Sequence, residues 1–212
     1  MMSMPTWIRT QLAMTLSLAT AIPASTAHAQ AISAFKIGED MRVVAKSHPK
    51  PSNTETLGSY SAFKWNLPGG NDLSVTASPE TGRIVFIESD WGGDPASAAS
   101  DVPGMTFGIT TLADIRKRFH SDGFGFKSNL GQATTDNLVS FNCYQIDSDP
   151  DSIVVFVTTL PIKDVPTVAG EPKLDLGKGH LEAVILSSLA YLKVTWGEDR
   201  VFDATYHPIP WK

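Results

Sequence analysis

The segment 103–126 constrains the fold most, because it reads as one short amphipathic helix between turns that contain glycine. Thr110 or Thr111 can cap the start of this helix. Asp114 would complete a capping box with Thr111, and Gly123 can end the helix. Apolar residues recur at the spacing of one helical face, namely Leu112, Ile115 and Phe119. We therefore expect this helix to pack on an apolar surface.

Strand patterns dominate the chain before this helix. Two alternating segments, 63–67 and 73–76, flank a turn at 68–71, which is the pattern of a β-hairpin. The next segment, 83–91, begins with apolar residues on both faces, which is typical of a central strand. A short helix is expected within 35–51. Residues 30–92 are therefore predicted to form a first unit of one helix and about three antiparallel strands.

The second half follows the same order. Residues 93–102 are mostly small and are predicted to be a linker, and residues 103–212 are predicted to form a second unit with an extended C-terminal tail. Its predicted strands lie around Phe141, at 153–158 and at 181–186, with 191–195 as a fourth candidate. The predicted fold class is α+β, with two tandem units, each a short helix packed on an antiparallel sheet of about three to four strands.

Two pairs of short motifs support a repeat. Ile37-Gly38 and Phe107-Gly108 open the two units, and Val75-Thr76 and Val157-Thr158 occur in their strands. Chance similarity is the alternative. Over 37–91 and 107–186 the chain resembles the beta-lactamase-inhibitor-protein family and the related SmpA/OmlA outer-membrane-assembly modules. The resemblance implies a protein-binding scaffold, an inhibitor or an assembly accessory. The chain differs from both families in its cysteines: it lacks the paired cysteines of the inhibitors and the lipobox cysteine of the assembly modules.

The N-terminus has the pattern of a signal peptide. Arg9 ends a positively charged region, the apolar run 12–22 is too short to span a bilayer, and residues 27–29 read Ala-His-Ala, a cleavage signal. Residues 1–29 are therefore predicted to be a signal peptide, and a buried first helix is the alternative. No stable membrane anchor is expected, and the predicted location is the periplasm or the extracellular medium.

The charge and the cysteine content argue against a nucleic-acid-binding protein and against a disulfide-stabilised one. The chain has 212 residues, a formal net charge of −5 and no basic block longer than residues 116–118, so nucleic acid is not an expected partner. Cys143 is the single cysteine, so no intramolecular disulfide can form. Its strand-like surroundings favour a buried thiol over a nucleophile.

Catalytic motifs are absent from the sequence. It has no G-x-S-x-G, no H-E-x-x-H, no paired C-x-x-C and no P-loop. His120, His180 and His207 lack ligand spacing, so neither a metal nor a cofactor is expected, although folding could assemble such a site. No catalytic residue is therefore predicted. The alternative is a periplasmic hydrolase in which Glu88 and Asp90 meet one of these histidines.

A polar sheet face is the remaining candidate site. Strand alternation should turn Lys64, Asn66, Ser74 and Thr76 outward, together with Glu88 and Asp90, and Trp91 and Tyr144 should lie at the rim. A sheet that is solvated on one face would look the same. The sequence therefore predicts an exported, non-catalytic binding module whose partner is another envelope or secreted protein.

Overall fold

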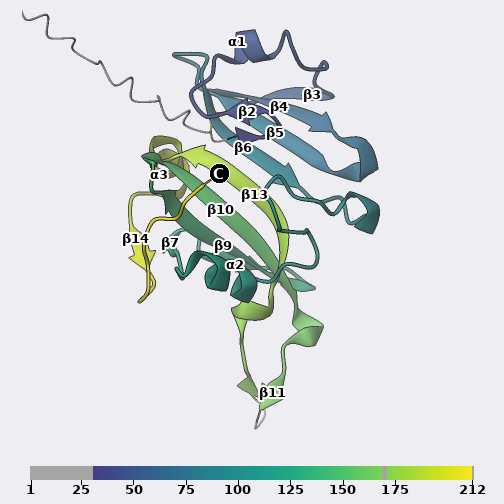
Figure 1. The fold of residues 1–212 in the computed structure, drawn as a ribbon, viewed down its shortest axis with the longest axis vertical. Helices are drawn as coiled ribbons and strands as arrows, with labels where there is room; N and C mark the ends of the chain where they lie inside the picture. Colours follow the sequence, from purple (N-terminus) through teal and green to yellow (C-terminus); the bar gives the residue numbers. More distant parts are fainter. Residues whose placement is uncertain (1–30, 169–170, 212) are drawn as a thin grey trace, which may run out of the picture.

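One antiparallel sheet of ten strands forms most of the molecule (Figure 1). The computed structural model describes residues 31–168 and 171–211, so the predicted signal peptide lies outside the described residues. Across the sheet the strand order is β14-β7-β9-β10-β13-β6-β5-β4-β3, and β8 pairs with β9 beside this path. These strands are β3 (Asn53–Leu57), β4 (Tyr60–Asn66), β5 (Asp72–Ala77), β6 (Ile84–Asp90), β7 (Phe124–Phe126), β8 (Gly131–Ala133), β9 (Asn137–Ile146), β10 (Asp149–Pro161), β13 (His180–Ser188) and β14 (Arg200–Phe202).

The remaining elements are short. The α-helices are α1 (Met41–Val44), α2 (Leu112–Phe119) and α3 (Leu189–Trp196), and the 3-10 turns are η1 (Pro68–Gly70), η2 (Pro95–Ser97), η3 (Ile162–Asp164) and η4 (Leu176–Lys178). Two small hairpins stand apart from the main sheet: β1 (Ala31–Ile32) with β2 (Phe35–Lys36), and β11 (Thr167–Val168) with β12 (Glu171–Pro172). The second hairpin projects from the body (Figure 1).

The prediction of two tandem helix-on-sheet units is wrong. Strands β6 and β13, which would have ended the two units, pair with each other from Phe86–Ser187 to Asp90–Ala183. Both strands carry apolar residues on both faces, and such strands are stable only in the interior of a sheet. Helix α1 has four residues and α2 has eight, which is too little helix to cover two separate sheets.

Helix α2 forms as the sequence predicts at its start. Thr111 is the N-cap, and the capping box is complete: the Asp114 amide donates to Thr111 Oγ1 at 3.2 Å and the Thr111 amide donates to Asp114 Oδ2 at 3.0 Å. The helix ends earlier than predicted, because His120 takes a left-handed conformation with φ 52° before Gly123 is reached.

The fourth strand predicted at 191–195 is instead part of helix α3. Ser188 caps this helix, and its side chain accepts a hydrogen bond from the Tyr191 amide at 3.2 Å. Leu192 is buried while Val194 is exposed, so this segment has one apolar face directed at the sheet. The β-branched residues Val194 and Thr195 account for the wrong prediction.

The two faces of the sheet carry separate cores. On the first face, sheet residues such as Trp65, Val75 and Phe156 pack with Phe35 of the N-terminal hairpin and with Ile115 of α2. On the second face, a smaller core lies between strands β7, β9, β10, β13 and helix α3. Among the described elements, only α3 reaches the second face of β3, β4 and β5, where Tyr191 packs against Tyr60 at the start of β4. The rest of this face therefore stays open.

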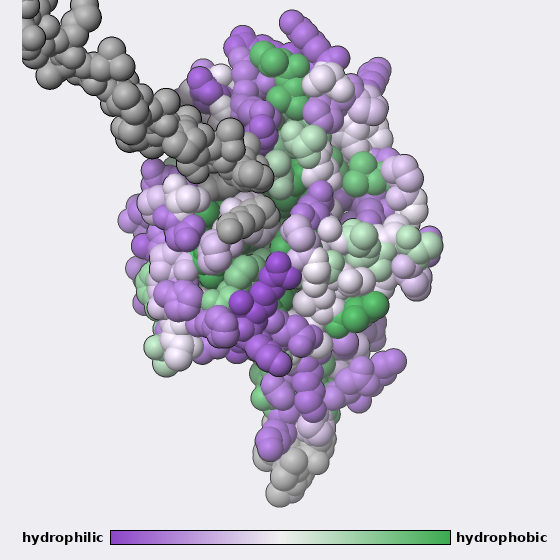
Figure 2. Space-filling model, in the orientation of Figure 1, coloured by the Kyte–Doolittle hydropathy of each residue, from purple (hydrophilic) through white to green (hydrophobic). Residues whose placement is uncertain are grey.

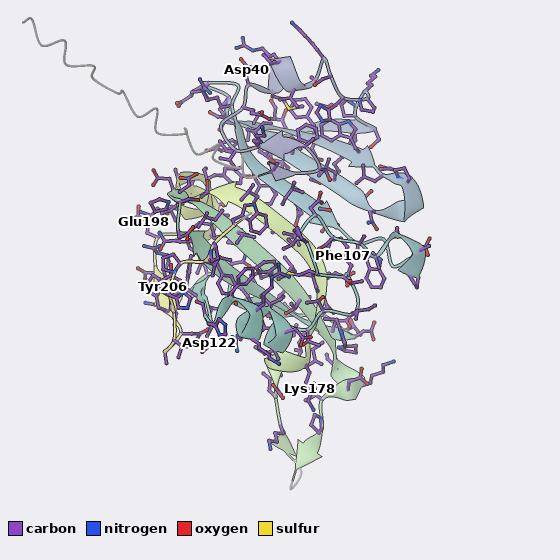
Figure 3. The ribbon with its side chains drawn as sticks, viewed as in Figure 1. Asp40, Phe107, Asp122, Lys178, Glu198 and Tyr206 are labelled. Atoms are coloured by element: carbon purple, nitrogen blue, oxygen red, sulfur yellow. The ribbon has the colours of Figure 1, made fainter. Side chains whose placement is uncertain are left out.

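The C-terminal tail packs on the first core as an extended strap. Ile209 is fully buried and bridges Ile146 of β9, and Tyr206 donates to Gln145 Oε1 at 2.7 Å. Figure 3 shows Tyr206 and Asp122 on the side of the molecule where this tail runs, and Thr205 is hydrogen-bonded to Asp122. The tail closes the α2 side of the core.

No helix in the described part of the chain is long and apolar enough to cross a membrane. On the face shown in Figure 2, hydrophilic residues predominate and apolar residues reach the surface in small groups.

Candidate binding site

The open part of the second sheet face contains a hollow of about 390 Å³, which we call the acidic hollow. Its lining residues come from β3, β4, β5, β6, β9, β13, α3 and one loop: Glu55, Leu57, Ala62, Lys64, Ser74, Thr76, Phe86, Glu88, Asp90, Asn129, Phe141, Ile185, Tyr191, Thr195 and Trp196. It therefore combines groups from both halves of the sequence. The pairing of β6 with β13 is what brings them together.

Strand register determines which polar groups meet. Two rows cross β4, β5 and β6 as direct neighbours: Lys64–Ser74–Glu88 and Asn66–Asp72–Asp90. Side chains alternate along β6, so Ile87 and Ser89 are buried on the first face while Glu88 and Asp90 turn to the second. Asp72 and Asp90 are directly opposite each other, an arrangement of like charges that destabilises a sheet.

The two carboxyl groups of β6 are hard to ionise. Burial, and then the charge of Asp90, raise the pKa of Glu88 to about 7, against a smaller opposing effect of Lys64. Burial, and then the charge of Asp72, raise the pKa of Asp90 to about 6, again opposed by Lys64. Burial and the charge of Asp90 also raise the pKa of Glu182. Ionising these carboxyl groups therefore costs the folded state free energy.

Neither carboxylate is compensated within the described part of the chain. No described side chain or backbone group forms a hydrogen bond with the carboxylate of Glu88 or Asp90, and no described cation lies within 4 Å of either group. Lys64 is exposed and makes no ion pair with a described carboxylate. When these carboxyl groups ionise, the charge of Lys64 offsets theirs only in part.

Aromatic rings form the opposite wall. Tyr191 of α3 packs edge-on against Tyr60 at 4.9 Å between ring centroids and contacts Phe86 at 5.6 Å. Trp196 packs edge-on against Phe141 at 5.6 Å. Rings held by neighbouring rings keep their positions, and an aromatic face attracts a cation. The hollow thus presents two kinds of group that favour positive charge.

No protein-family model matches this sequence, and no curated protein matches it. Two solved structures are similar to the fold. One is an extracellular protein containing a SCP domain from Bacillus anthracis, with 13% identity, a TM-score of 0.46, and coverage of 81% of this chain and 50% of that chain. The other is a cysteine-rich secretory protein from Staphylococcus aureus, with 9% identity, a TM-score of 0.46, and coverage of 81% of this chain and 48% of that chain.

This chain spans about half the length of the two structures that it matches. At these TM-scores the likeness assigns neither a family nor a function. Neither protein is described as a beta-lactamase inhibitor or as an assembly module. The resemblance to those families is wrong, because the tandem units on which it depended form one continuous sheet.

The remaining predicted site residues lie outside the hollow. Asn66 is exposed, and its Oδ1 accepts a hydrogen bond from Ser52 at 2.9 Å. Trp91 follows β6, donates from Nε1 to the Asp94 carbonyl at 3.0 Å and packs against the first core. Tyr144 is fully buried in the first core, so it does not lie at the rim where the sequence placed it. Its neighbours in β9 alternate between two covered faces.

Trp91 packs directly on Gly108, which has φ +68°. A Cβ at this position would overlap the Trp91 ring, so Gly108→Ala is expected to lower the free energy of unfolding by about 1–2 kcal/mol through the strained φ and the displaced ring. Gly93→Ala is the matched control, because Gly93 has φ +86° and nothing within 4 Å of such a Cβ. Urea unfolding measures both. Equal losses in the two variants would mean that Trp91 packing contributes nothing.

The structure brings none of the three histidines into the hollow. His207 Nε2 lies 2.7 Å from the His120 carbonyl oxygen, and His180 Nδ1 lies 3.3 Å from the Ile109 carbonyl oxygen. The described residues contain no group of three or more histidine, cysteine, aspartate or glutamate side chains that could hold a metal. The carboxylate and histidine groups of the alternative hydrolase do not converge.

The thiol of Cys143 is fully buried in the second core, as predicted, and burial raises its pKa.

Three residues at or beside the hollow were not predicted from the sequence, namely Asp72, Tyr191 and Trp196. Asp72 could have been found, because the predicted hairpin and the alternation of 83–91 already place it near Asp90. The two aromatic residues could not, because Tyr191 was assigned to a strand and Trp196 to the C-terminal tail, whereas both belong to helix α3.

Proposed function

We propose that this chain is an exported binding module whose acidic hollow holds a positively charged segment of another envelope or secreted protein. One observation carries the proposal: Glu88 and Asp90 lie on the same face of one strand, without an ion pair to any described residue, in a hollow walled by Tyr191 and Trp196. The export of the chain rests on the signal pattern in residues 1–29. An inhibitor and an assembly accessory would both act through such a contact.

Charge complementarity selects the partner. The hollow is lined by three carboxylates, those of Glu55, Glu88 and Asp90, against one lysine, Lys64. A lysine or arginine side chain can place its apolar stem on the rings and its charged head among the carboxylates. Burial, and then repulsion between neighbouring carboxylates, raise the pKa values of Glu88 and Asp90, and a bound cation would relieve the repulsion. A neutral or acidic segment would gain neither interaction.

None of the described histidines lines the hollow, which separates this proposal from the hydrolase. A carboxylate and histidine site needs the two groups within hydrogen-bond reach of one another or of a shared water. The rings of His180 and His207 contact backbone carbonyl oxygens elsewhere in the fold, and none of His120, His180 and His207 lines the hollow. A binding site needs no such convergence, and an open sheet face is accessible to an extended segment.

The test is calorimetric titration of the mature chain at low ionic strength with the peptide Lys-Thr-Lys-Thr-Lys and with the matched neutral peptide Gln-Thr-Gln-Thr-Gln. We expect saturable binding of the lysine peptide only, because charge pairs in the hollow supply the affinity. The double variant Glu88→Gln/Asp90→Asn should bind it about tenfold more weakly or worse.

The control double variant is Glu80→Gln/Asp164→Asn. It removes the same two charges from exposed residues that do not line the hollow. Its affinity should equal that of the unmodified chain. Equal weakening in both double variants would show that the peptide responds to net charge alone, and absence of saturable binding would remove the proposed function.

A further inference from the structure

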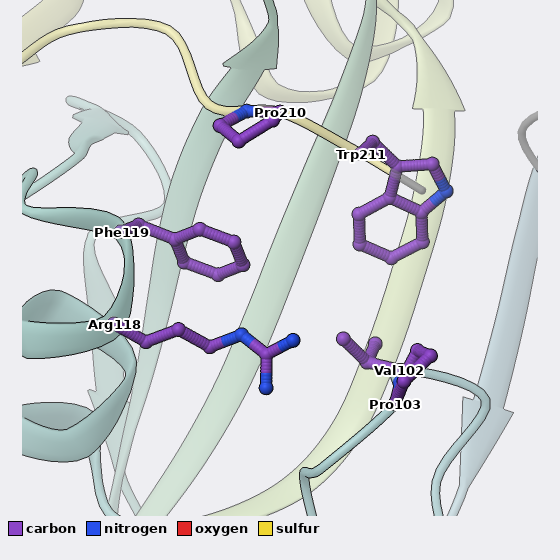
Figure 4. Close-up of a pocket in the computed structure, with 6 residues that line it drawn as sticks. All are labelled: Val102, Pro103, Arg118, Phe119, Pro210 and Trp211. Carbon is purple, nitrogen blue, oxygen red and sulfur yellow. The ribbon is translucent and has the colours of Figure 1, made fainter.

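A second, smaller groove lies on the first face of the sheet, between α2 and the C-terminal tail (Figure 4). Six residues line about 240 Å³: Val102, Pro103, Arg118, Phe119, Pro210 and Trp211. Arg118 and Phe119 come from the last turn of α2, Val102 and Pro103 from the loop before it, and Pro210 and Trp211 from the tail. Three segments that are distant in sequence thus form one groove.

Five of the six lining residues are apolar, and Arg118 is the single charged group among them. The side chains of Val102, Phe119 and Trp211 are buried, so they form a fixed floor. Figure 4 shows Arg118 extended beside the Phe119 ring toward Val102 and Pro103, with Trp211 across the groove. The guanidinium carbon lies 5.7 Å from the centroid of the Phe119 ring.

The position of Arg118 is set by its neighbours. A Cβ on Gly104 would lie 2.9 Å from Arg118 Nη1, so the guanidinium rests directly on the backbone of the loop. Among the described carboxylates, none lies within 4 Å of Arg118, whereas Arg116 two residues earlier pairs with Asp203 at 3.4 Å. The guanidinium is therefore held at the groove with its ion-pairing capacity unused by the described residues.

Charge and shape together select a ligand class. A guanidinium offers two parallel N–H donors that match the two oxygens of a carboxylate. The buried rings beside it accept an apolar body. The volume is below the roughly 300–1,000 Å³ of sites for drug-sized ligands, so the ligand must be small. Asp114, one turn earlier on α2, lines a separate hollow with Arg118; its carboxylate is hydrogen-bonded to Thr111, and Asp114 is not among the residues that line this groove.

We propose that this groove binds a small free carboxylic acid with an apolar body, its carboxylate paired with Arg118 and its apolar part between Phe119 and Trp211. This site is independent of the acidic hollow. It lies on the other face of the sheet and takes a ligand of the opposite charge.

The probe is phenylacetate, and its neutral isostere phenylacetamide is the ligand control. The readout is the indole Nε1–H resonance of Trp211 in a ¹⁵N-labelled full chain, identified by its loss in Trp211→Phe. We expect phenylacetate to shift this resonance saturably, and phenylacetamide to bind about tenfold more weakly or worse because it cannot form the charged pair.

The variant Arg118→Met keeps the apolar stem and should weaken phenylacetate binding about tenfold or more. Lys117→Met removes the same charge from the adjacent exposed position and should leave the binding unchanged. Both residues are exposed, so the fold tolerates both changes. Equal binding of the acid and the amide, equal losses in the two variants, or the absence of a saturable shift of Trp211 would each overturn the proposal.

Discussion

Leu186→Ala is expected to lower the free energy of unfolding by about 2–5 kcal/mol and to shift a single transition of the whole chain. Leu186 is fully buried on β13, opposite Val154 of β10 and Ile87 of β6. Its core joins residues from both halves of the sequence, among them Trp65 and Phe156. A cavity at this junction therefore weakens packing on both sides at once.

Urea unfolding followed by far-ultraviolet circular dichroism and by tryptophan fluorescence tests this expectation. Transitions that coincide for the two probes indicate one cooperative unit. Val194→Ala is the control, because the Val194 side chain is 71% exposed and should change stability little. Two separate transitions, of which the variant moves only one, would mean that the halves fold as independent units.

Glu88→Gln is expected to raise the free energy of unfolding at about pH 8 by about 1–3 kcal/mol. The pKa of Glu88 is raised from 4.5 to about 7 in the folded protein by burial and by the charge of Asp90. Ionisation above that value thus costs the folded state more than the unfolded state. Glutamine occupies about the same volume as glutamate and carries no charge. The folded variant therefore does not pay the cost of ionising a buried carboxyl group at about pH 8.

The sign of the effect fixes its pH dependence. The contribution of protonated Glu88 is fully present below pH 4.5 and is lost as the pH rises through about 7, so the two proteins should converge in acid. Thermal unfolding across this range measures the difference. Glu80→Gln, at an exposed position in the turn before β6, controls for net charge. A variant as stable as the unmodified chain at every pH would mean that Glu88 carries no excess cost.

The stability cost and the proposed binding involve the same carboxyl group of Glu88, whose pKa is raised first by burial and then by the charge of Asp90. The repulsion between Glu88, Asp90 and Asp72 is an unfavourable interaction within the fold that a bound cation would relieve. Glu88→Gln should therefore strengthen the fold and weaken the binding of the lysine peptide at the same time. A purely structural role for Glu88 does not predict these opposite changes.

Local signals in the sequence predicted local structure well. The hairpin of 63–67 and 73–76 corresponds to β4 and β5, and the capping box of α2 forms at Thr111 and Asp114. These features depend on a few neighbouring residues. Strand β7, which follows Gly123, gave no such signal, because all three of its residues are buried and the alternation of a half-buried strand is missing.

The pairing of β6 with β13 could not be predicted from either half of the sequence alone, because the two strands are about 100 residues apart. The apolar start of 83–91 predicted a central strand, yet a unit of three strands ending at residue 90 would have left it at an edge. That conflict was the available sign that β6 has another neighbour. Which strand pairs there depends on long-range packing, which short motifs do not encode.

Alternation along strands placed Lys64, Glu88 and Asp90 on one face, and the structure gathers these three in the acidic hollow. Tyr144 followed the same kind of pattern but lies under α2 and the tail, because a strand in the middle of a sheet is covered on both faces. The hollow itself exists because α3 covers only part of the second face. How much of the second face α3 covers could not be predicted from the sequence of any single segment.

The ¹³C carboxyl resonances of Glu88 and Asp90, titrated with acid in the absence and presence of the lysine peptide, test most directly whether these groups hold a cation. We expect midpoints near 7 for Glu88 and near 6 for Asp90 in the free protein, and a fall of both midpoints when the peptide is bound. Midpoints near the ordinary values of about 4, unmoved by the peptide, would contradict this expectation.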